Sequence, residues 1–278
     1  MVREIAPAKV NLLLHVGSPR PDGLHELCSL FASIDLHDSL TVEVAGTDEV
    51  VCPGVRGPNL AATAIVRLRE ALGGALSPLR VTIDKRIPVA AGLGGGSADA
   101  AAVLRAGNRL AARPLGEAPL RELAAELGAD VPSQVEPRHA LVTGAGEVVE
   151  PLALPPMALV LVPRDRGLST PAVYREADRL GATRARLDPD GVRRLAALPT
   201  RELAPLLAND LQPAALSLRP ELEAGLGALR RAGALTALVT GSGPTLFGLF
   251  QDRSAAEVAA RAVPRALVAG LAHDSAAR

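Results

Sequence analysis

The chain has 278 residues, enough for one large domain or two medium-sized ones. Hydrophobic residues make up 48% and charged residues 22%, so the composition excludes a wholly disordered chain. The 30 basic and 30 acidic residues cancel, which argues against a broad electrostatic surface for nucleic acid or an anionic membrane and leaves room for a local anion site.

Hydrophobic periodicity, capping residues, and glycine and proline positions predict a mixture of strands and helices. The predicted strands are residues 4–16, 79–87, 139–149 (as one or two short strands), 157–163, 234–239, 245–250 and 266–272. Residues 24–45 contain a further β-like stretch, which ends in SLTVEVA (39–45). The predicted helices are residues 59–72, 97–112, 117–127, 171–180, 190–197, 201–208, 219–232 and 254–262. Because strands and helices do not alternate strictly, the order favours α+β layers over a doubly wound parallel sheet.

The Pro-rich segment 151–156 is the predicted boundary between two domains, 1–153 and 154–278. The tail 273–278 is expected to be frayed. One tyrosine and three phenylalanines are the whole aromatic content, so alanine and leucine must fill the core.

Cysteine and histidine usage gives no sign of a disulfide framework or a metal-binding motif. The cysteines are only Cys28 and Cys52, and the five histidines are scattered. The N-terminal segment lacks the apolar core of a signal peptide, and the longest apolar runs, such as 157–162, are far shorter than a membrane span. We therefore expect a cytoplasmic protein with neither a nucleic-acid nor a membrane partner, and one sequence leaves its oligomeric state open.

The segment PVAAGLGGGSA (88–98) lies between a predicted strand and a predicted helix. Glycines let the backbone approach an anion, and a helix N-terminus favours negative charge. A flexible linker would not explain why the glycines directly precede a helix. The Walker lysine and the features of a dinucleotide fingerprint are both missing. We expect the loop to bind an anion such as phosphate through Pro88, Val89, Ala90, Ala91, Gly92, Leu93, Gly94, Gly95, Gly96, Ser97 and Ala98.

Together with this loop, five other segments resemble the GHMP kinase superfamily in collinear order over nearly the whole chain. They are APAKVNLLLHV (6–16), DGLHELCSLFASIDLHD (22–38), LGADVPSQV (127–135), NDLQP (209–213) and TGSGPTLFGLF (240–250). Within the superfamily they resemble the family of 4-diphosphocytidyl-2-C-methyl-D-erythritol kinases.

The resemblance implies a two-domain α+β fold, with an N-terminal domain like domain 2 of ribosomal protein S5 and a C-terminal ferredoxin-like α/β sandwich. It implies ATP and Mg²⁺ as cofactors. The reaction would phosphorylate the 2-hydroxyl of a small-molecule substrate that carries a cytidine diphosphate group, in the non-mevalonate route to isoprenoid precursors.

Phosphoryl transfer to an alcohol requires a held triphosphate, neutralised charge and a placed hydroxyl that loses its proton. Asp130, in a polar break before Pro132, is the candidate base. Lys9, on an apolar strand, is its candidate partner. Both match catalytic residues of the family, whereas an unrelated chain would more often carry such residues on its surface. Ser97 could bind phosphate or Mg²⁺ through its hydroxyl, or could only cap the helix.

The segments expected to bind the substrate depart from the family pattern at one position. Leu24 stands where relatives often have a tyrosine that stacks on the cytosine. His25 could bind the edge of the base, and Tyr174 matches the second stacking aromatic. Asn11 is expected to position the substrate.

Four further features have two interpretations each. Asn59 matches a residue near the adenosine and could also cap the helix that follows. Lys85 lies on the strand that enters the nucleotide site, where a structural role is equally open. Asp99 replaces a more usual asparagine, and its charge would be unfavourable near phosphate unless it faced Mg²⁺ or solvent. The turn Gly241-Ser242-Gly243 resembles a motif near the phosphates, but it could also be an ordinary hairpin turn.

Two alternatives to this function remain. One is another GHMP kinase, acting on homoserine or mevalonate. The other is a nucleotide-binding regulator without catalytic activity, against which Lys9, Ser97 and Asp130 argue.

Overall fold

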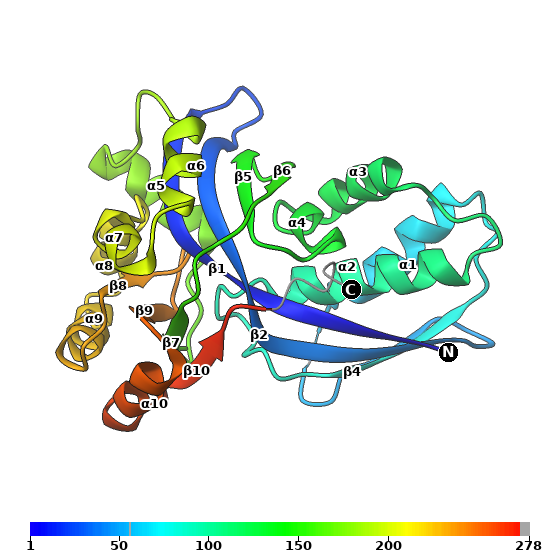
Figure 1. The fold of residues 1–278 in the computed structure, drawn as a ribbon. Helices are drawn as coiled ribbons and strands as arrows, with labels where there is room; N and C mark the ends of the chain where they lie inside the picture. The colour runs from blue at the N-terminus through cyan, green and yellow to red at the C-terminus, as the bar shows by residue number, and fades with distance from the viewer. Residues whose placement is uncertain (56, 273–278) are drawn as a thin grey trace. The chain divides into compact units, whose positions relative to one another are not determined.

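The computed structural model describes residues 1–55 and 57–272, and Figure 1 labels most of their helices and strands. The chain forms two compact units. The first contains residues 1–8, 36–89 and 94–137, and the second contains residues 9–35, 90–93 and those from 138 onward. Each unit gathers separate segments, so no single cut in the sequence divides them, and the domain boundary after residue 153 stays a prediction. The tail 273–278 lies outside the described residues.

Two long strands, β1 (Val2–Pro19) and β2 (His25–Val44), pair with each other and run from one unit into the other. In the first unit, β2 pairs antiparallel with β4 (Leu79–Asp84), and β4 pairs parallel with β3 (Glu49–Val51). The helices of this unit are α1 (Leu60–Ala71), α2 (Gly95–Leu110), α3 (Glu117–Leu127) and α4 (Pro132–Val135).

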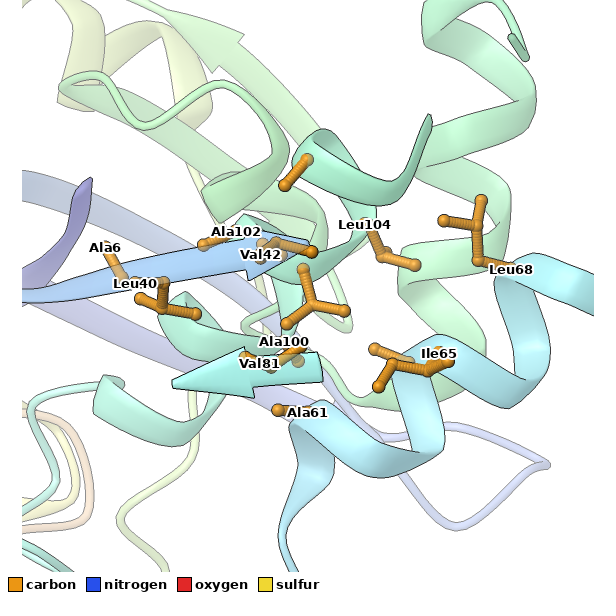
Figure 2. Close-up of a cluster of buried hydrophobic side chains, with 14 of the residues drawn as sticks. Ala6, Leu40, Val42, Ala61, Ile65, Leu68, Val81, Ala100, Ala102 and Leu104 are labelled. Atoms are coloured by element: carbon orange, nitrogen blue, oxygen red, sulfur yellow. The ribbon is translucent and has the colours of Figure 1, made fainter. Parts of the chain in front are cut away.

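Aliphatic side chains, many of them alanine and leucine, build the core of the first unit (Figure 2). Leu79, Val81 and Ile83 alternate with exposed residues along β4, so one face of the strand is buried. Ala100 and Ala102 of α2 lie among the aliphatic side chains of the neighbouring elements. The predicted core of alanine and leucine is confirmed.

In the second unit, β2 pairs with β5 (Ala140–Gly144), which pairs with β6 (Val148–Pro151). A second, antiparallel sheet has the order β10-β7-β9-β8. Its strands are β7 (Ala158–Val162), β8 (Thr236–Val239), β9 (Leu246–Phe250) and β10 (Leu267–Gly270).

The helical elements of the second unit are α5 (Thr170–Leu180), α6 (Pro189–Ala196), α7 (Thr200–Leu203), the 3₁₀ helix η1 (Ala204–Leu206), α8 (Gln212–Leu218), α9 (Leu222–Arg231) and α10 (Arg253–Ala262). Ala158, Val160 and Val162 form one face of β7 and pack in the same core as α9 and α10. Helices fall between β7 and β8 and between β9 and β10, which is the β-α-β-β-α-β arrangement of a ferredoxin-like domain. The predicted α+β class is confirmed.

The structure corrects several predicted boundaries. The helix predicted from residue 97 begins at Gly95, and the helix predicted over 201–208 is α7 followed by η1. Helices α4 and α8 and strand β3 were not predicted. At three to seven residues they are too short for a periodic pattern to reveal them. No helix in residues 1–55 or 57–272 is long and apolar enough to cross a bilayer.

Candidate active site

The last part of the Gly-rich loop forms the first turn of α2, in the first unit. Gly94 is the N-cap residue, with φ 71° in the left-handed region that glycine adopts without strain. The amide of Ala98 donates to the carbonyl of Gly94 at 2.8 Å, which begins the helical hydrogen-bond ladder. The amides of Gly95, Gly96 and Ser97 therefore belong to the helix start, where N–H groups have no partner inside the helix and can bind an anion. Because Gly94 caps the helix, the alternative of Ser97 as N-cap is wrong.

The middle of the loop, residues 90–93, belongs to the second unit and lies against the turn between β8 and β9. The amide of Thr245 donates to the carbonyl of Ala91 at 3.3 Å. A Cβ at Gly92 would lie 2.5 Å from the carbonyl oxygen of Gly243, so only glycine fits there. The turn is a hairpin, as its ordinary interpretation predicted, since Thr240 and Thr245 pair across it. It is also in direct contact with the loop.

Lys9 is buried in β1 of the second unit and has polar neighbours. Its Nζ donates to Oδ1 of Asn11 at 2.7 Å and lies 4.5 Å from the centre of the Phe31 ring. Its backbone amide donates to the carbonyl of Leu93 at 3.0 Å. Since Leu93 immediately precedes Gly94, this bond fixes the loop next to the residue that starts the helix.

Asn11 is held from both sides. Its Nδ2 donates to the Ser29 hydroxyl at 2.9 Å, and that hydroxyl donates to the carbonyl of Leu13 at 2.6 Å. Its backbone amide donates to Oγ1 of Thr240 at 2.8 Å. A Cβ at Gly241 would lie 3.1 Å from Oδ1 of Asn11 and 4.0 Å from Nζ of Lys9. The structure thus brings Lys9, Asn11 and the glycine turn together in one unit.

Asn209 anchors this turn, and its role was not predicted. Its Nδ2 donates to the carbonyls of Val239 and Gly241, both at 2.8 Å, and its Oδ1 accepts from the amide of Leu211 at 2.9 Å. The side chain is buried and its polar atoms are satisfied. The only signal in the sequence was the segment NDLQP, which resembles the family without showing what the asparagine does.

In the first unit, a charged cluster lies behind the start of α2. Nζ of Lys85 donates to Oδ2 of Asp38 and to Oδ2 of Asp99, both at 2.6 Å. Oδ1 of Asp38 also accepts from the amide of Ile87 at 2.8 Å. A Cβ at Gly95 would lie 3.1 Å from Nζ of Lys85, so the ammonium lies directly against the backbone of the helix start.

Asp99 does not face solvent, because its carboxylate pairs with the Lys85 ammonium, a partner that the sequence did not reveal. Its side chain is 3% exposed, and among the described residues its Oδ1 has no hydrogen-bond partner. Burial raises the pKa of Asp99 to about 7, the charge of Lys85 opposes this rise and Asp38 adds to it. Burial lowers the pKa of Lys85, but the two carboxylates outweigh it and the net shift is upward.

The residues predicted to bind the substrate base meet in the second unit. Nε2 of His25 lies 2.8 Å from Oδ1 of Asp178, and the ring centres of His25 and Tyr174 are 5.0 Å apart. The ring of His25 is nearly buried, whereas Leu24 is 52% exposed. His25 and Tyr174 are therefore neighbours, and Asp178 is a partner that the sequence did not reveal.

The remaining predicted residues lie in the first unit. Oδ1 of Asn59 accepts from the amide of Ala61 at 3.0 Å, which confirms that Asn59 caps α1. Asp130 lies in the turn between α3 and α4, and its carbonyl accepts from the Ser133 hydroxyl at 2.8 Å. The contact of Asn59 with adenosine and the role of Asp130 as a base stay predictions.

Within residues 1–55 and 57–272, no group of three or more histidine, cysteine, aspartate or glutamate side chains is arranged to hold a metal ion. Mg²⁺ in kinases takes most of its ligands from nucleotide phosphates and water and needs only one or two from the protein. The half-buried Ser97, on the first turn of α2, fits this mode.

Two models of known protein families match the chain. The GHMP kinases N terminal domain matches residues 59–136, and the GHMP kinases C terminal domain matches residues 193–269. A solved homoserine kinase from Cytophaga hutchinsonii ATCC 33406 is similar with a TM-score of 0.75 over 98% of this chain and 94% of that one. At 19% identity that likeness shows the fold alone.

The sequence identity to 4-diphosphocytidyl-2-C-methyl-D-erythritol kinases is much higher than the identity to this homoserine kinase. A 4-diphosphocytidyl-2-C-methyl-D-erythritol kinase of Nocardia farcinica (strain IFM 10152) is 46% identical over 95% of this chain and 90% of its own length. A protein of the same name from Anaeromyxobacter dehalogenans (strain 2CP-C) is 45% identical over 93% and 84%.

A crystal structure of 4-(cytidine 5'-diphospho)-2C-methyl-D-erythritol kinase is similar with a TM-score of 0.84 and 39% identity, over 98% of this chain and all of that one. The loop at the start of α2, the buried Lys9 and these similarities lead to one conclusion. The chain belongs to the GHMP kinases, in the family of 4-diphosphocytidyl-2-C-methyl-D-erythritol kinases.

Proposed function

We propose that this chain transfers the γ-phosphate of ATP to the 2-hydroxyl of 4-diphosphocytidyl-2-C-methyl-D-erythritol, in the non-mevalonate route to isoprenoid precursors. The observation that carries the proposal is the 46% identity over 95% of the chain to a kinase named for this substrate. The reaction would take place in the cytoplasm and involve neither nucleic acid nor membrane.

The Gly-rich loop is the proposed phosphate site. The amides of Gly95, Gly96 and Ser97 lie in the first turn of a helix of 16 residues, whose dipole favours the negative phosphates. Residues from Pro88 to Leu93 complete the loop, and Asn59 is the proposed neighbour of the adenosine. Mg²⁺, held by Ser97 and the nucleotide, would neutralise phosphate charge during transfer.

Lys9 and Asp130 are the proposed catalytic residues. Asp130 accepts the proton of the 2-hydroxyl while that oxygen forms a bond to the γ-phosphorus and the bond to the β-phosphate oxygen breaks. The Lys9 ammonium stabilises the negative charge that develops on the hydroxyl oxygen. Asn11, bonded to Lys9 at 2.7 Å, fixes the ammonium and positions the acceptor.

The proposed binding site for the substrate base consists of His25 and Tyr174. Tyr174 is proposed to stack on the cytosine, with His25 at the edge of the base. The exposed Leu24 offers a smaller apolar surface for stacking than an aromatic ring would.

An ADP-release assay with ATP, Mg²⁺ and a panel of acceptors tests the proposal. We expect turnover with 4-diphosphocytidyl-2-C-methyl-D-erythritol and only background rates with homoserine and mevalonate. Turnover with homoserine and none with the cytidine substrate would contradict it. ATP binding without turnover of any acceptor would favour a non-catalytic regulator.

A further inference from the structure

The imidazole of His25 is fixed by two residues of α5. Tyr174 and Asp178 are four positions apart, so both lie on the same side of this helix. The Tyr174 ring meets the His25 ring at an angle of 42° with centres 5.0 Å apart. Asp178 bonds Nε2 of the same ring at 2.8 Å. Tyr174 thus contacts the His25 ring as a whole, and Asp178 fixes its Nε2 atom.

The bond to Asp178 determines which nitrogen carries the proton. A carboxylate has only acceptor atoms, so the Nε2–H of His25 is the donor. Arg179, the next residue on α5, is bonded to Glu176 at 2.7 Å by each of two nitrogens and does not compete for Asp178. In the neutral ring Nδ1 is then an acceptor. Among the described residues Nδ1 has no hydrogen-bond partner, and it is not fully enclosed.

We infer that Asp178 is a positioning residue that holds His25 in the Nε2–H tautomer, so that Nδ1 is presented as an acceptor to the 4-amino group of the substrate cytosine. This rests on the proposed function, because it assigns a specificity role to a residue that supports the proposed base-binding histidine. Asp178 acts through His25 and does not itself touch the substrate.

The arrangement distinguishes cytosine from uracil by hydrogen-bond polarity. Cytosine carries an amino donor at position 4, whereas uracil carries a carbonyl acceptor there. If uracil lay against Nδ1, its carbonyl oxygen and Nδ1 would both be acceptors, so no hydrogen bond could form between them. A buried polar group would then be left unsatisfied. If Nδ1 carried the proton instead, the preference would reverse. The carboxylate of Asp178 therefore determines whether the site prefers cytosine or uracil.

Binding of CDP and of UDP to the wild-type protein and to Asp178→Ala, measured by calorimetry, tests this inference. We expect the wild type to prefer CDP by about 10- to 100-fold. In Asp178→Ala the ring loses its fixed tautomer, and the preference should fall to within about threefold. Asp178→Asn, whose amide can accept from or donate to Nε2, should lower the preference too, and it serves if the alanine variant fails to fold. Asp165→Asn, an exposed carboxylate paired with Arg265, is the matched control and should keep the wild-type ratio.

Two further measurements separate positioning from a purely structural role. In steady-state assays, Asp178→Ala should raise KM for the cytidine substrate while kcat at saturation stays within about twofold. The ¹⁵N shifts of His25 in the wild-type protein at pH 7.5 should show a protonated Nε2 and an unprotonated Nδ1.

A protonated Nδ1, or an unchanged preference for CDP in a folded Asp178→Ala, would overturn the inference. Absence of turnover with the cytidine substrate in the wild type would instead contradict the proposed function. The two failures are therefore distinguishable.

Discussion

The ammonium of Lys85, a largely buried side chain, lies 2.6 Å from the carboxylate of the buried Asp99, at the start of the helix that follows the Gly-rich loop. Asp38 takes a second bond from the same ammonium. Two carboxylates thus share one cation, so the cluster carries an uncompensated negative charge whenever both are ionised. Such a charge is costly in a buried site and unfavourable near bound phosphate.

Replacing Asp99 with asparagine should change how stability depends on pH. The folded-state pKa of Asp99 is raised to about 7 by burial, from an ordinary value of 3.8. The stability that the neutral Asp99 carboxyl contributes to the folded state is therefore fully present below about pH 4 and is lost as the pH rises through 7. Asp99→Asn cannot ionise, so its unfolding free energy relative to the wild type should be higher at pH 8 than at pH 5 in urea titrations.

Asp84→Asn is the control for this experiment, because Asp84 is 63% exposed and pairs with Arg86 at the surface. Its stability should follow that of the wild type at both pH values. Parallel pH curves for Asp99→Asn and the wild type would show that Asp99 is ionised at all pH values tested.

Replacing Lys85 with methionine should be strongly destabilising. It leaves Asp38 and Asp99 buried without their cation, and breaking such a pair costs about 3–5 kcal/mol. Chemical denaturation at pH 8 measures the loss. The double variant Lys85→Met/Asp99→Asn should recover part of it, because one of the two buried charges is then removed. Arg86→Met, at a side chain 61% exposed, should change the unfolding free energy by less than about 0.5 kcal/mol.

Two glycines of the loop should respond differently to alanine. In Gly92→Ala the new Cβ would meet the carbonyl of Gly243 at 2.5 Å, and φ is 78°. We expect a loss of about 1–3 kcal/mol of stability. In Gly96→Ala the Cβ meets nothing within 4 Å, so stability should be kept or slightly increased. Calorimetry should nevertheless show weaker ATP binding to Gly96→Ala, because its Cβ stands at the proposed phosphate site. Equal ATP affinity in Gly96→Ala and the wild type would place the phosphates elsewhere.

Replacing Lys9 with methionine should lower kcat by about 100-fold or more while KM for ATP changes little, because the ammonium acts on the acceptor oxygen. Steady-state kinetics measures both values. Arg3→Met, at an exposed position on the same strand, is the matched control and should retain wild-type turnover. A Lys9→Met enzyme with near-normal kcat would remove Lys9 from the catalytic residues.

Local signals in the sequence predicted much of the fold. The helix predicted over 117–127 has those same bounds, and the cap at Asn59 is formed as predicted. The Gly-rich loop was identified because its glycines directly precede a strong helical pattern. Each of these features depends on residues within one or two turns of each other, so a short window of sequence contains the information.

Contacts between distant segments were not predictable in the same way. Asp38 and Lys85 are 47 positions apart, and His25 and Asp178 are 153 apart. No local pattern marks Asp38 as the partner of Lys85, which follows another strand, or Asp178 as the partner of His25, which lies on a strand far away in the sequence. Lys85 and Asp99 are 14 positions apart, and only the fold brings the lysine against the start of α2, so the sequence suggested Mg²⁺ or solvent as the surroundings of Asp99.

The position of the transferred phosphate tests the central claim most directly. Wild-type enzyme, ATP and 4-diphosphocytidyl-2-C-methyl-D-erythritol are incubated, and the product is analysed by ³¹P NMR with its couplings to the carbon skeleton. The account predicts one new phosphomonoester, on the 2-hydroxyl, formed in equal amount to ADP and abolished in Asp130→Ala. ADP release without this ester, or an ester on another hydroxyl, would contradict it.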